Sequence, residues 1–171
     1  PIVEKTEEEN EKLLTAAGKM SAKMRAVRII SAASVSKKDL QQRLIQKGED
    51  PDQATQAVAW LSDLDLIDDR KTAEHIVDRC IRRGYGISRA KQALYEKQIP
   101  KTYWDAALSD YPDQQDKILT FLQSRLRENW DEKDLRRAVD ALLRRGHAYS
   151  QIRKALHEFS KEAELQEDYY G

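Results

Sequence analysis

The chain has too little cysteine, histidine and glycine for several common kinds of functional site. Its single cysteine, Cys80, cannot form a disulfide within the chain. The three histidines, with one thiol, make no cluster that has the spacing of metal ligands. No segment has the GxxxxGK pattern, followed by serine or threonine, that cradles nucleotide phosphates. We therefore expect no catalytic site, no metal and no cofactor.

Long apolar runs and an excess of charge of one sign are also missing. No run approaches the roughly 18 apolar residues that suggest a membrane span, and the N-terminus lacks the residue order of a signal peptide. A cytoplasmic protein is expected, which suits a lone cysteine. Thirty basic residues balance thirty acidic ones. Because this balance leaves no global basic field, we expect weak or no autonomous binding to DNA.

What the chain contains is typical of helices. Charged residues make up 35% and apolar residues 40%, with six glycines and four prolines. Residues 68–97 show the pattern most clearly. Asp68 or Asp69 can cap a helix whose apolar face includes Val77 and Cys80, and helix capping explains this acidic pair better than acid–base chemistry. The left-handed conformation of Gly84 is expected to end that helix, and Ser88 to open the next.

A second copy of this pattern lies further along the chain. Segment 69–96 and segment 131–158 share an aspartate start, an Arg-Arg-Gly turn and an Ala-Leu pair. A weaker match relates the region around Val27 and Leu44 to the region around Val77 and Leu94. We therefore predict an all-α fold, an elongated array of three tandem three-helix repeats in one monomer. The expected divisions are a leader or weak helix at 1–19, units at 20–67, 68–111 and 112–160, and an acidic tail at 161–171.

Motifs in the middle unit resemble those of a known family. The motifs are LDLIDD at 64–69, RRGYG at 82–86, RAKQAL at 89–94 and KQI at 97–99. They resemble the signature of the RecX family of bacterial regulators, and the resemblance extends over about residues 25–159. The chain departs from the family pattern at four positions. Asp65 and Gln98 stand where the family tends to have glycine, Thr72 where it has an aromatic residue, and Ile87 where it has proline.

The resemblance implies a function that composition alone does not. A RecX protein binds the RecA recombinase on single-stranded DNA and restrains the nucleoprotein filament, lowering its ATPase and strand-exchange activities in DNA repair, recombination and the SOS response. It has no catalytic site of its own. The alternative hypothesis, drawn from the helical units alone, is a nucleic-acid-binding module that acts on DNA without a protein target.

Basic residues at the repeated turns are the candidate partner-binding site. They recur at matching places in two units, where they suit the negative end of a helix dipole. One interpretation is a solvated helix end. The other is an interrupted basic strip that contacts an acidic protein surface or a phosphate backbone. Tyr85 either stacks on a partner or packs within its turn. The candidate residues are Arg82, Arg83, Tyr85, Arg89, Lys91, Arg144, Arg145, Arg153 and Lys154.

Overall fold

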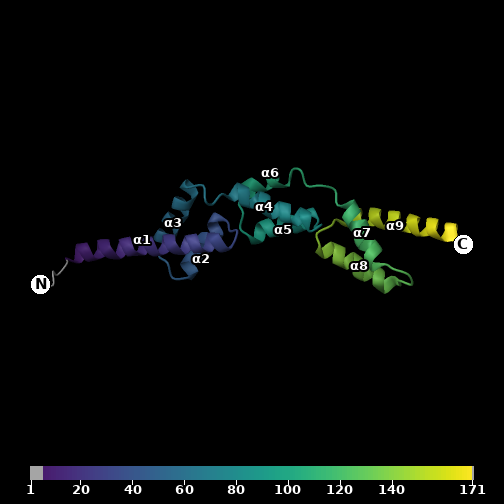
Figure 1. Cartoon of the computed structure of the whole chain (residues 1–171), viewed down its shortest axis with the longest axis horizontal. Coiled ribbons are helices and arrows are strands. Elements are labelled where there is room, and N and C mark those ends of the chain that lie inside the picture. The colour runs from purple at the N-terminus through teal and green to yellow at the C-terminus, as the bar shows by residue number, and fades with distance from the viewer. Residues whose placement is uncertain (1–5, 171) are drawn as a thin grey trace. The chain divides into compact units, whose positions relative to one another are not determined.

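The computed structural model describes the backbone of residues 6–170 and the side chains of residues 6–164. Within this range the chain forms nine α-helices and one short 3-10 helix, with no strand, so the all-α prediction is confirmed. No helix in the described range is long and apolar enough to cross a membrane. In chain order, the elements are α1 (Glu7–Ala32), α2 (Lys37–Gln46), α3 (Pro51–Asp63), α4 (Asp69–Arg82), α5 (Ile87–Glu96), the 3-10 helix (Lys101–Tyr103), α6 (Trp104–Leu108), α7 (Gln115–Arg125), α8 (Glu132–Arg144) and α9 (Tyr149–Tyr170) (Figure 1).

Several helix boundaries differ from those expected. Helix α1 passes through Gly18 without a break, because a capping box between Thr6 and Glu9 starts the helix before the expected leader ends. Ser88 does not open α5, since the carbonyl of Gly86 already accepts the N–H groups of Arg89 and Ala90. Helix α9 continues past residue 160 into the acidic tail. These differences arise from local caps that the apolar periodicity does not report.

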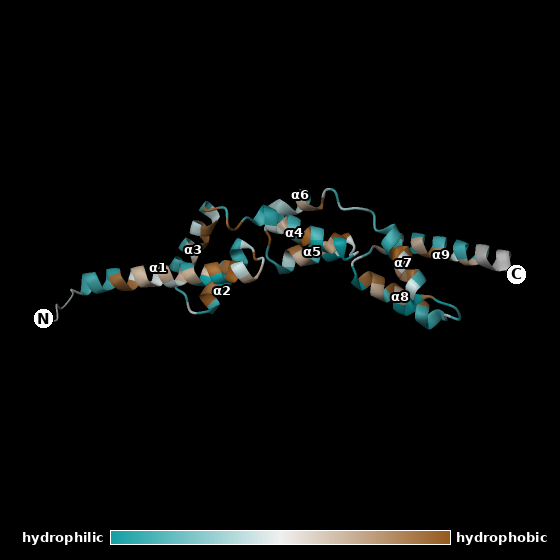
Figure 2. Ribbon diagram, in the orientation of Figure 1, coloured by the Kyte–Doolittle hydropathy of each residue, from teal (hydrophilic) through white to brown (hydrophobic). Residues whose placement is uncertain are grey.

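The chain divides into two compact units, which we describe separately. The first comprises residues 1–73 and 97–103, and the second comprises residues 74–96 and 104–171. The three-repeat organisation stays a prediction. In the first unit α1 and α2 both pack on α3, and hydrophobic residues gather in the C-terminal half of α1 and in α2 (Figure 2). The members of its core cluster that expose no surface are Ala22, Ala26, Leu40, Leu44, Ala54 and Leu61, each 0% exposed.

Two buried carboxylates tie the helices of the first unit together. Glu49 accepts hydrogen bonds from the Ser21 hydroxyl at 2.7 Å and from Nε of Arg25 at 2.9 Å, which fixes the turn after α2 against α1. The acidic pair at the start of α4, Asp68 and Asp69, caps two different helices. Asp68 caps α4 through the N–H of Arg70 at 2.9 Å, whereas buried Asp69 accepts the N–H of Lys37 at 2.9 Å and so caps α2. Helix capping thus accounts for the positions of both Asp68 and Asp69.

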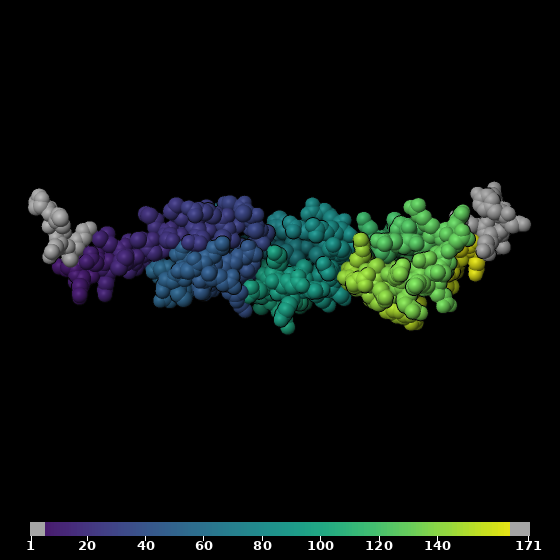
Figure 3. All heavy atoms as spheres, turned by 90° about the horizontal axis from the view of Figure 1, so that it is seen from below, coloured from purple at the N-terminus to yellow at the C-terminus, as the bar shows by residue number. Residues whose placement is uncertain are grey.

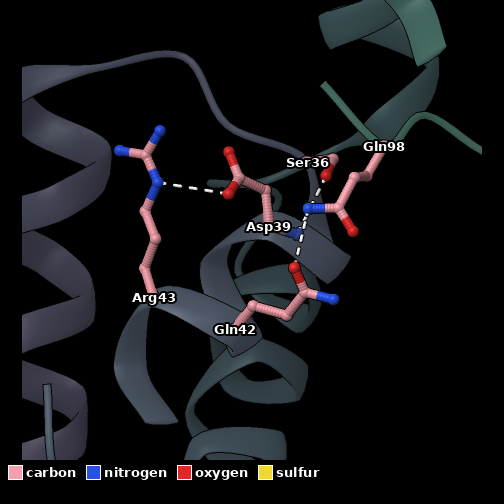
Figure 4. Close-up of polar contacts among 5 residues, drawn as sticks. All are labelled: Ser36, Asp39, Gln42, Arg43 and Gln98. Atoms are coloured by element: carbon pink, nitrogen blue, oxygen red, sulfur yellow. Dashed lines mark hydrogen bonds and ion pairs between the residues drawn. The ribbon is translucent and has the colours of Figure 1, made fainter. Parts of the chain in front are cut away.

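Two non-glycine residues of the first unit occupy the left-handed region. Asp65 and Gln98 both have φ of 57°, and they stand at two of the positions where the resemblance led us to expect glycine. Both turns therefore retain the left-handed conformation without glycine, which strains the backbone at Asp65 and Gln98. At Gln98 the side chain compensates in part, because its Nε2 donates a hydrogen bond of 2.8 Å to Oε1 of Gln42 on α2 (Figure 4). The same view shows the ion pair between Arg43 and Asp39 at 3.2 Å.

Asp65→Gly should stabilise the first unit by roughly 0.5–1 kcal/mol. A left-handed conformation costs an L-residue about 1–2 kcal/mol, and the greater freedom of glycine in the unfolded chain returns part of that gain. Urea denaturation followed by far-UV circular dichroism measures the change. Ala59→Gly, an exposed substitution within helix α3 of the same unit, is the control and should destabilise by about 1 kcal/mol. A parent-like or lower stability for Asp65→Gly would mean that this turn carries no strain.

The second unit is built on α7, which packs against both α8 and α9. In the space-filling view the green atoms of α7 and α8 form one continuous surface (Figure 3). Asp131 and Asp134 form a capping box at the start of α8, and Nε2 of Gln115 donates to the carbonyl of Gln151 in α9 at 3.0 Å. The core residues of these three helices are Ile118, Leu122, Leu126, Ala138, Leu142, Ile152 and Ala155.

Candidate functional site

The two Arg-Arg-Gly turns end their helices in the same way. Gly84 has φ of 73° and Gly146 has φ of 91°, which confirms the left-handed conformation predicted for Gly84. After Gly84, the N–H of Tyr85 bonds to the carbonyl of Cys80 at 3.0 Å. After Gly146, the N–H of His147 bonds to the carbonyl of Leu142 at 3.2 Å. Each turn therefore presents its second arginine immediately before a tight backbone reversal.

The same two turns dock directly on each other. The N–H of Gly86 donates to the carbonyl of Arg145 at 2.9 Å. The backbones approach so closely that a Cβ on Gly86 would overlap the carbonyl of Gly146, and a Cβ on Gly146 would overlap the backbone of Arg89. Glycine is needed at both positions for this approach. Two turns that lie far apart in the sequence thus form one structural element of the second unit.

Docking brings four of the nine candidate residues together. Cζ of Arg89 lies 5.3 Å, and Cζ of Arg145 lies 6.0 Å, from the ring centroid of Tyr85. Arg83 and Arg145 line one shared cavity. Tyr85 is half-buried among these residues, so it packs within its own turn. The guanidinium groups of Arg89 and Arg145 also lie over its ring. The other five candidates lie apart from these four. Cζ of Arg153 is 4.8 Å from the ring centroid of Tyr149. The remaining four have exposed side chains: Arg82, Lys91, Arg144 and Lys154.

Helix α7 adds three residues that the sequence reasoning missed. Lys117, Phe121 and Arg125 recur at every fourth position and so lie on one face of α7. The ring centroid of Phe121 is 4.9 Å from Cζ of Arg125 and 5.0 Å from Cζ of Arg145. The stem of Lys117 lies beside Gly84, where a Cβ added to the glycine would meet it at an ordinary van der Waals distance of 3.5 Å. The alternation of basic and aromatic residues at this spacing is a signal that could have identified the face.

The cationic cluster, which we define as Arg83, Arg89, Lys117, Arg125 and Arg145, makes no ion pair with a carboxylate among the described side chains. The ion pairs found among the described side chains all lie in the first unit, at Glu8, Asp39 and Glu49. Five like charges on one side of the second unit repel one another, although salt screens exposed charges within about 10 Å. An anionic partner would relieve that repulsion. This surface is therefore our candidate binding site on the described part of the chain.

Burial keeps the two nearest weak acids of this region neutral. Burial raises the pKa of the Cys80 thiol even though Arg89, Arg83 and Arg79 act to lower it. Burial, with a smaller contribution from Cys80, raises the pKa of Tyr111 to about 12, and the Tyr111 hydroxyl donates to the carbonyl of Tyr85. Cys80 is thus a core residue, as predicted, and Tyr111 holds the Tyr85 turn in place.

A buried imidazole lies at the base of the cluster. His147 is 4% exposed, and its Nδ1 has no hydrogen-bond partner among the described residues. Burial lowers the pKa of His147, whereas a hydrogen bond with the Gly84 backbone raises it and the charge of Arg145 lowers it further. His147 is therefore uncharged at neutral pH. Across the described side chains, no group of three or more His, Cys, Asp or Glu residues could hold a metal ion.

Curated relatives share most of the length of the chain. A protein named regulatory protein RecX from Vibrio campbellii is 24% identical over 140 residues, which cover 80% of this chain and 90% of that protein. A protein of the same name from Stenotrophomonas maltophilia is 29% identical over 134 residues, covering 77% of this chain and 82% of the relative. No model of a protein family matches the chain.

Solved structures of the same fold carry the same name. The crystal structure of RecX from Lactobacillus salivarius superposes with a TM-score of 0.71 at 24% identity, covering 85% of this chain and 98% of that one. A second structure, titled regulatory protein RecX, gives a TM-score of 0.71 at 20% identity and covers 89% and 79%. The structures establish the fold. Curated relatives of this name, together with solved structures of the same fold, support the assignment of this chain to the RecX family.

Proposed function

We propose that this chain binds the RecA recombinase filament on single-stranded DNA and lowers its ATPase and strand-exchange activities. The observation that carries the proposal is the cationic cluster, where docked turns gather arginines that make no ion pair within the described part of the chain. The family resemblance supplies the partner. A surface of this kind recognises acidic groups, and its exposed charges act mainly on the association rate and on the salt dependence of binding.

Replacing Arg82, Arg83, Arg144 and Arg145 together by alanine should shift the inhibition curve to about tenfold higher concentration of the regulator or beyond. Each arginine is at least partly exposed, so a single change has a small effect and four together remove the strip. The measurement is single-stranded-DNA-dependent ATP hydrolysis by RecA against concentration of the regulator. Strand exchange, measured in parallel, should recover over the same range.

A matched control removes four other exposed basic residues, Arg70, Lys71, Arg136 and Arg137, and should leave inhibition unchanged. Circular dichroism must first show parent-like helicity in both variants. An unshifted inhibition curve for the turn variant would mean that the two arginine pairs are solvated helix ends. Contact with the filament would then have to be sought elsewhere on the chain.

A nucleic-acid-binding module without a protein target is the second candidate, because guanidinium groups beside Tyr85 and Phe121 also suit a nucleic acid strand. The salt dependence of binding distinguishes the DNA-binding module from the filament regulator. Binding to bare single-stranded DNA that falls steeply with salt, with an affinity equal to that for the filament, would favour this candidate over the regulator. Cosedimentation with filaments and with naked DNA at several salt concentrations measures both.

A further inference from the structure

Helix α1 carries apolar side chains on two opposite faces, and the first unit covers only one of them. On the covered face, Ala22 and Ala26 are each 0% exposed and belong to the core that α1 shares with α2 and α3. On the other face, Leu13, Met20 and Met24 are 49%, 66% and 54% exposed. A surface helix normally turns a polar face to the solvent. Packing within the first unit therefore does not account for the second apolar face of α1.

The residues of this second face recur with the spacing of a coiled-coil seam. Their separations alternate between three and four residues, which keeps one stripe of side chains against a neighbouring helix. We call this stripe the α1 seam, and all of its members are exposed: Asn10, Leu13, Ala17, Met20, Met24 and Val27. The α1 seam extends over about 26 Å at a rise of 1.5 Å per residue. Its length and straightness therefore suit a helix as the partner.

We propose that the α1 seam pairs with the α1 seam of a second copy of this chain, with the two helices antiparallel. In this arrangement Leu13 of each copy faces Met24 of the other, and Ala17 of each copy faces Met20 of the other. The small Ala17 leaves room for the longer Met20 side chain, so large and small residues alternate across the seam. Methionine adapts its shape readily to such a space. The α1 seam is thus complementary to itself, as a two-fold interface requires.

Charged residues beside the α1 seam favour this antiparallel pairing. Glu7 and Arg28 are both exposed and make no ion pair within the described part of the chain. In the antiparallel register, Glu7 of each copy lies beside Arg28 of the other, so two pairs of opposite charge form. A parallel pair would instead bring Lys23 of each copy beside Arg28 of the other and would leave Ala17 facing Ala17. Repulsion and an unfilled layer both oppose the parallel pair.

This inference goes beyond the proposed function and does not rest on it. The α1 seam belongs to the first unit, whereas the cationic cluster belongs to the second. Because the seam is short and contains the polar Asn10, the dimer should be weak and reversible, with a dissociation constant of about 10–100 µM. Such a dimer would replace the monomer that we expect from the sequence.

Sedimentation equilibrium of the full chain measures the association. Met20→Glu should weaken it at least about tenfold, because the carboxylate would lie in an apolar seam while glutamate still favours the helix. Thr15→Glu adds the same charge to an exposed position of α1 outside the seam and is the matched control, which should associate like the parent. Association that Met20→Glu leaves unchanged overturns the proposal. So does a parent that stays monomeric at about 1 mM, which would assign the α1 seam to a different protein.

Charge reversal tests the register. Glu7→Arg and Arg28→Glu should each weaken self-association about fivefold, because each places like charges beside each other twice in the dimer. A mixture of the two single variants should associate like the parent, since every such pair in the mixed dimer is of opposite charge. A mixture that associates as weakly as each variant alone overturns the register.

Cysteine crosslinking tests the orientation. An oxidised mixture of Leu13→Cys and Met24→Cys should give crosslinked heterodimers, because positions 13 and 24 face each other in the antiparallel pair. Leu13→Cys alone should stay uncrosslinked, since its two thiols would lie about 16 Å apart along the helix axis, too far for a disulfide. Cys80 is buried and should not contribute a crosslink. A disulfide formed by Leu13→Cys alone would indicate a parallel pair and overturn the proposal.

Discussion

Gly86→Ala should destabilise the second unit by about 2–3 kcal/mol, more than Gly84→Ala, which should cost about 1 kcal/mol. The Cβ of alanine at position 86 would overlap backbone atoms of Gly146 and His147, which cannot rotate aside, and overpacking of this kind costs about 1–3 kcal/mol. At Gly84 the added Cβ would meet only the flexible stem of Lys117 at 3.5 Å, leaving the strain of φ at 73° as the main cost.

Urea denaturation gives the two stabilities, and hydrogen exchange resolved along the chain assigns the loss to the second unit. Gly146→Ala combines both costs, because Gly146 has a positive φ and its Cβ would overlap the backbone of Arg89. It should therefore be at least as unstable as Gly86→Ala. If Gly86→Ala unfolds at the same urea concentration as the parent, the two turns do not dock in solution.

Acid should destabilise the second unit below about pH 6.5, before most carboxylates titrate. Burial lowers the pKa of His147 in the folded chain from the ordinary value of 6.5, so between the two values the unfolded chain binds more protons. Stability therefore rises with pH in this window and is lost as pH falls from the unfolded pKa toward the folded one. Each pH unit of separation between the two values corresponds to about 1.4 kcal/mol.

His147→Gln should remove this acid loss between pH 7 and pH 5, whereas His157→Gln should keep it, because His157 is exposed. The measurement is the urea midpoint at several pH values, at constant ionic strength and without phosphate. A parent-like loss of stability in His147→Gln would assign the acid sensitivity to another group.

Local signals in the sequence predicted much of the secondary structure. Helix α4 begins behind the capping Asp68 and ends before the left-handed Gly84, as the residue types indicated. The continuation of α1 through Gly18 was not predictable in this way. A glycine in a helix costs only about 1 kcal/mol, which neighbouring turns can offset. Boundaries of that kind depend on sums of small terms, which a pattern of apolar residues does not report.

The candidate site was predicted only in part, for a physical reason. Arg83, Tyr85, Arg89 and Arg145 were identified because a repeated turn places charge at matching positions. Phe121 and His147 were not, since their roles come from docking of the two turns and from the position of α7 against them. Such contacts join residues far apart in the sequence. One chain, without its relatives, carries no record of which of its turns approach each other.

The close approach of the two turns also sets where the repeat pattern can stop. In the segment that repeats residues 69–96, the place of Gly86 is taken by Ala148. The methyl group of Ala148 is the atom that this approach forbids at Gly86. A further copy of the unit added after α9 could therefore not seat its own glycine turn on Ala148 as Gly146 seats on Gly86. Seating a glycine turn on position 148 in the same way would first require Ala148→Gly.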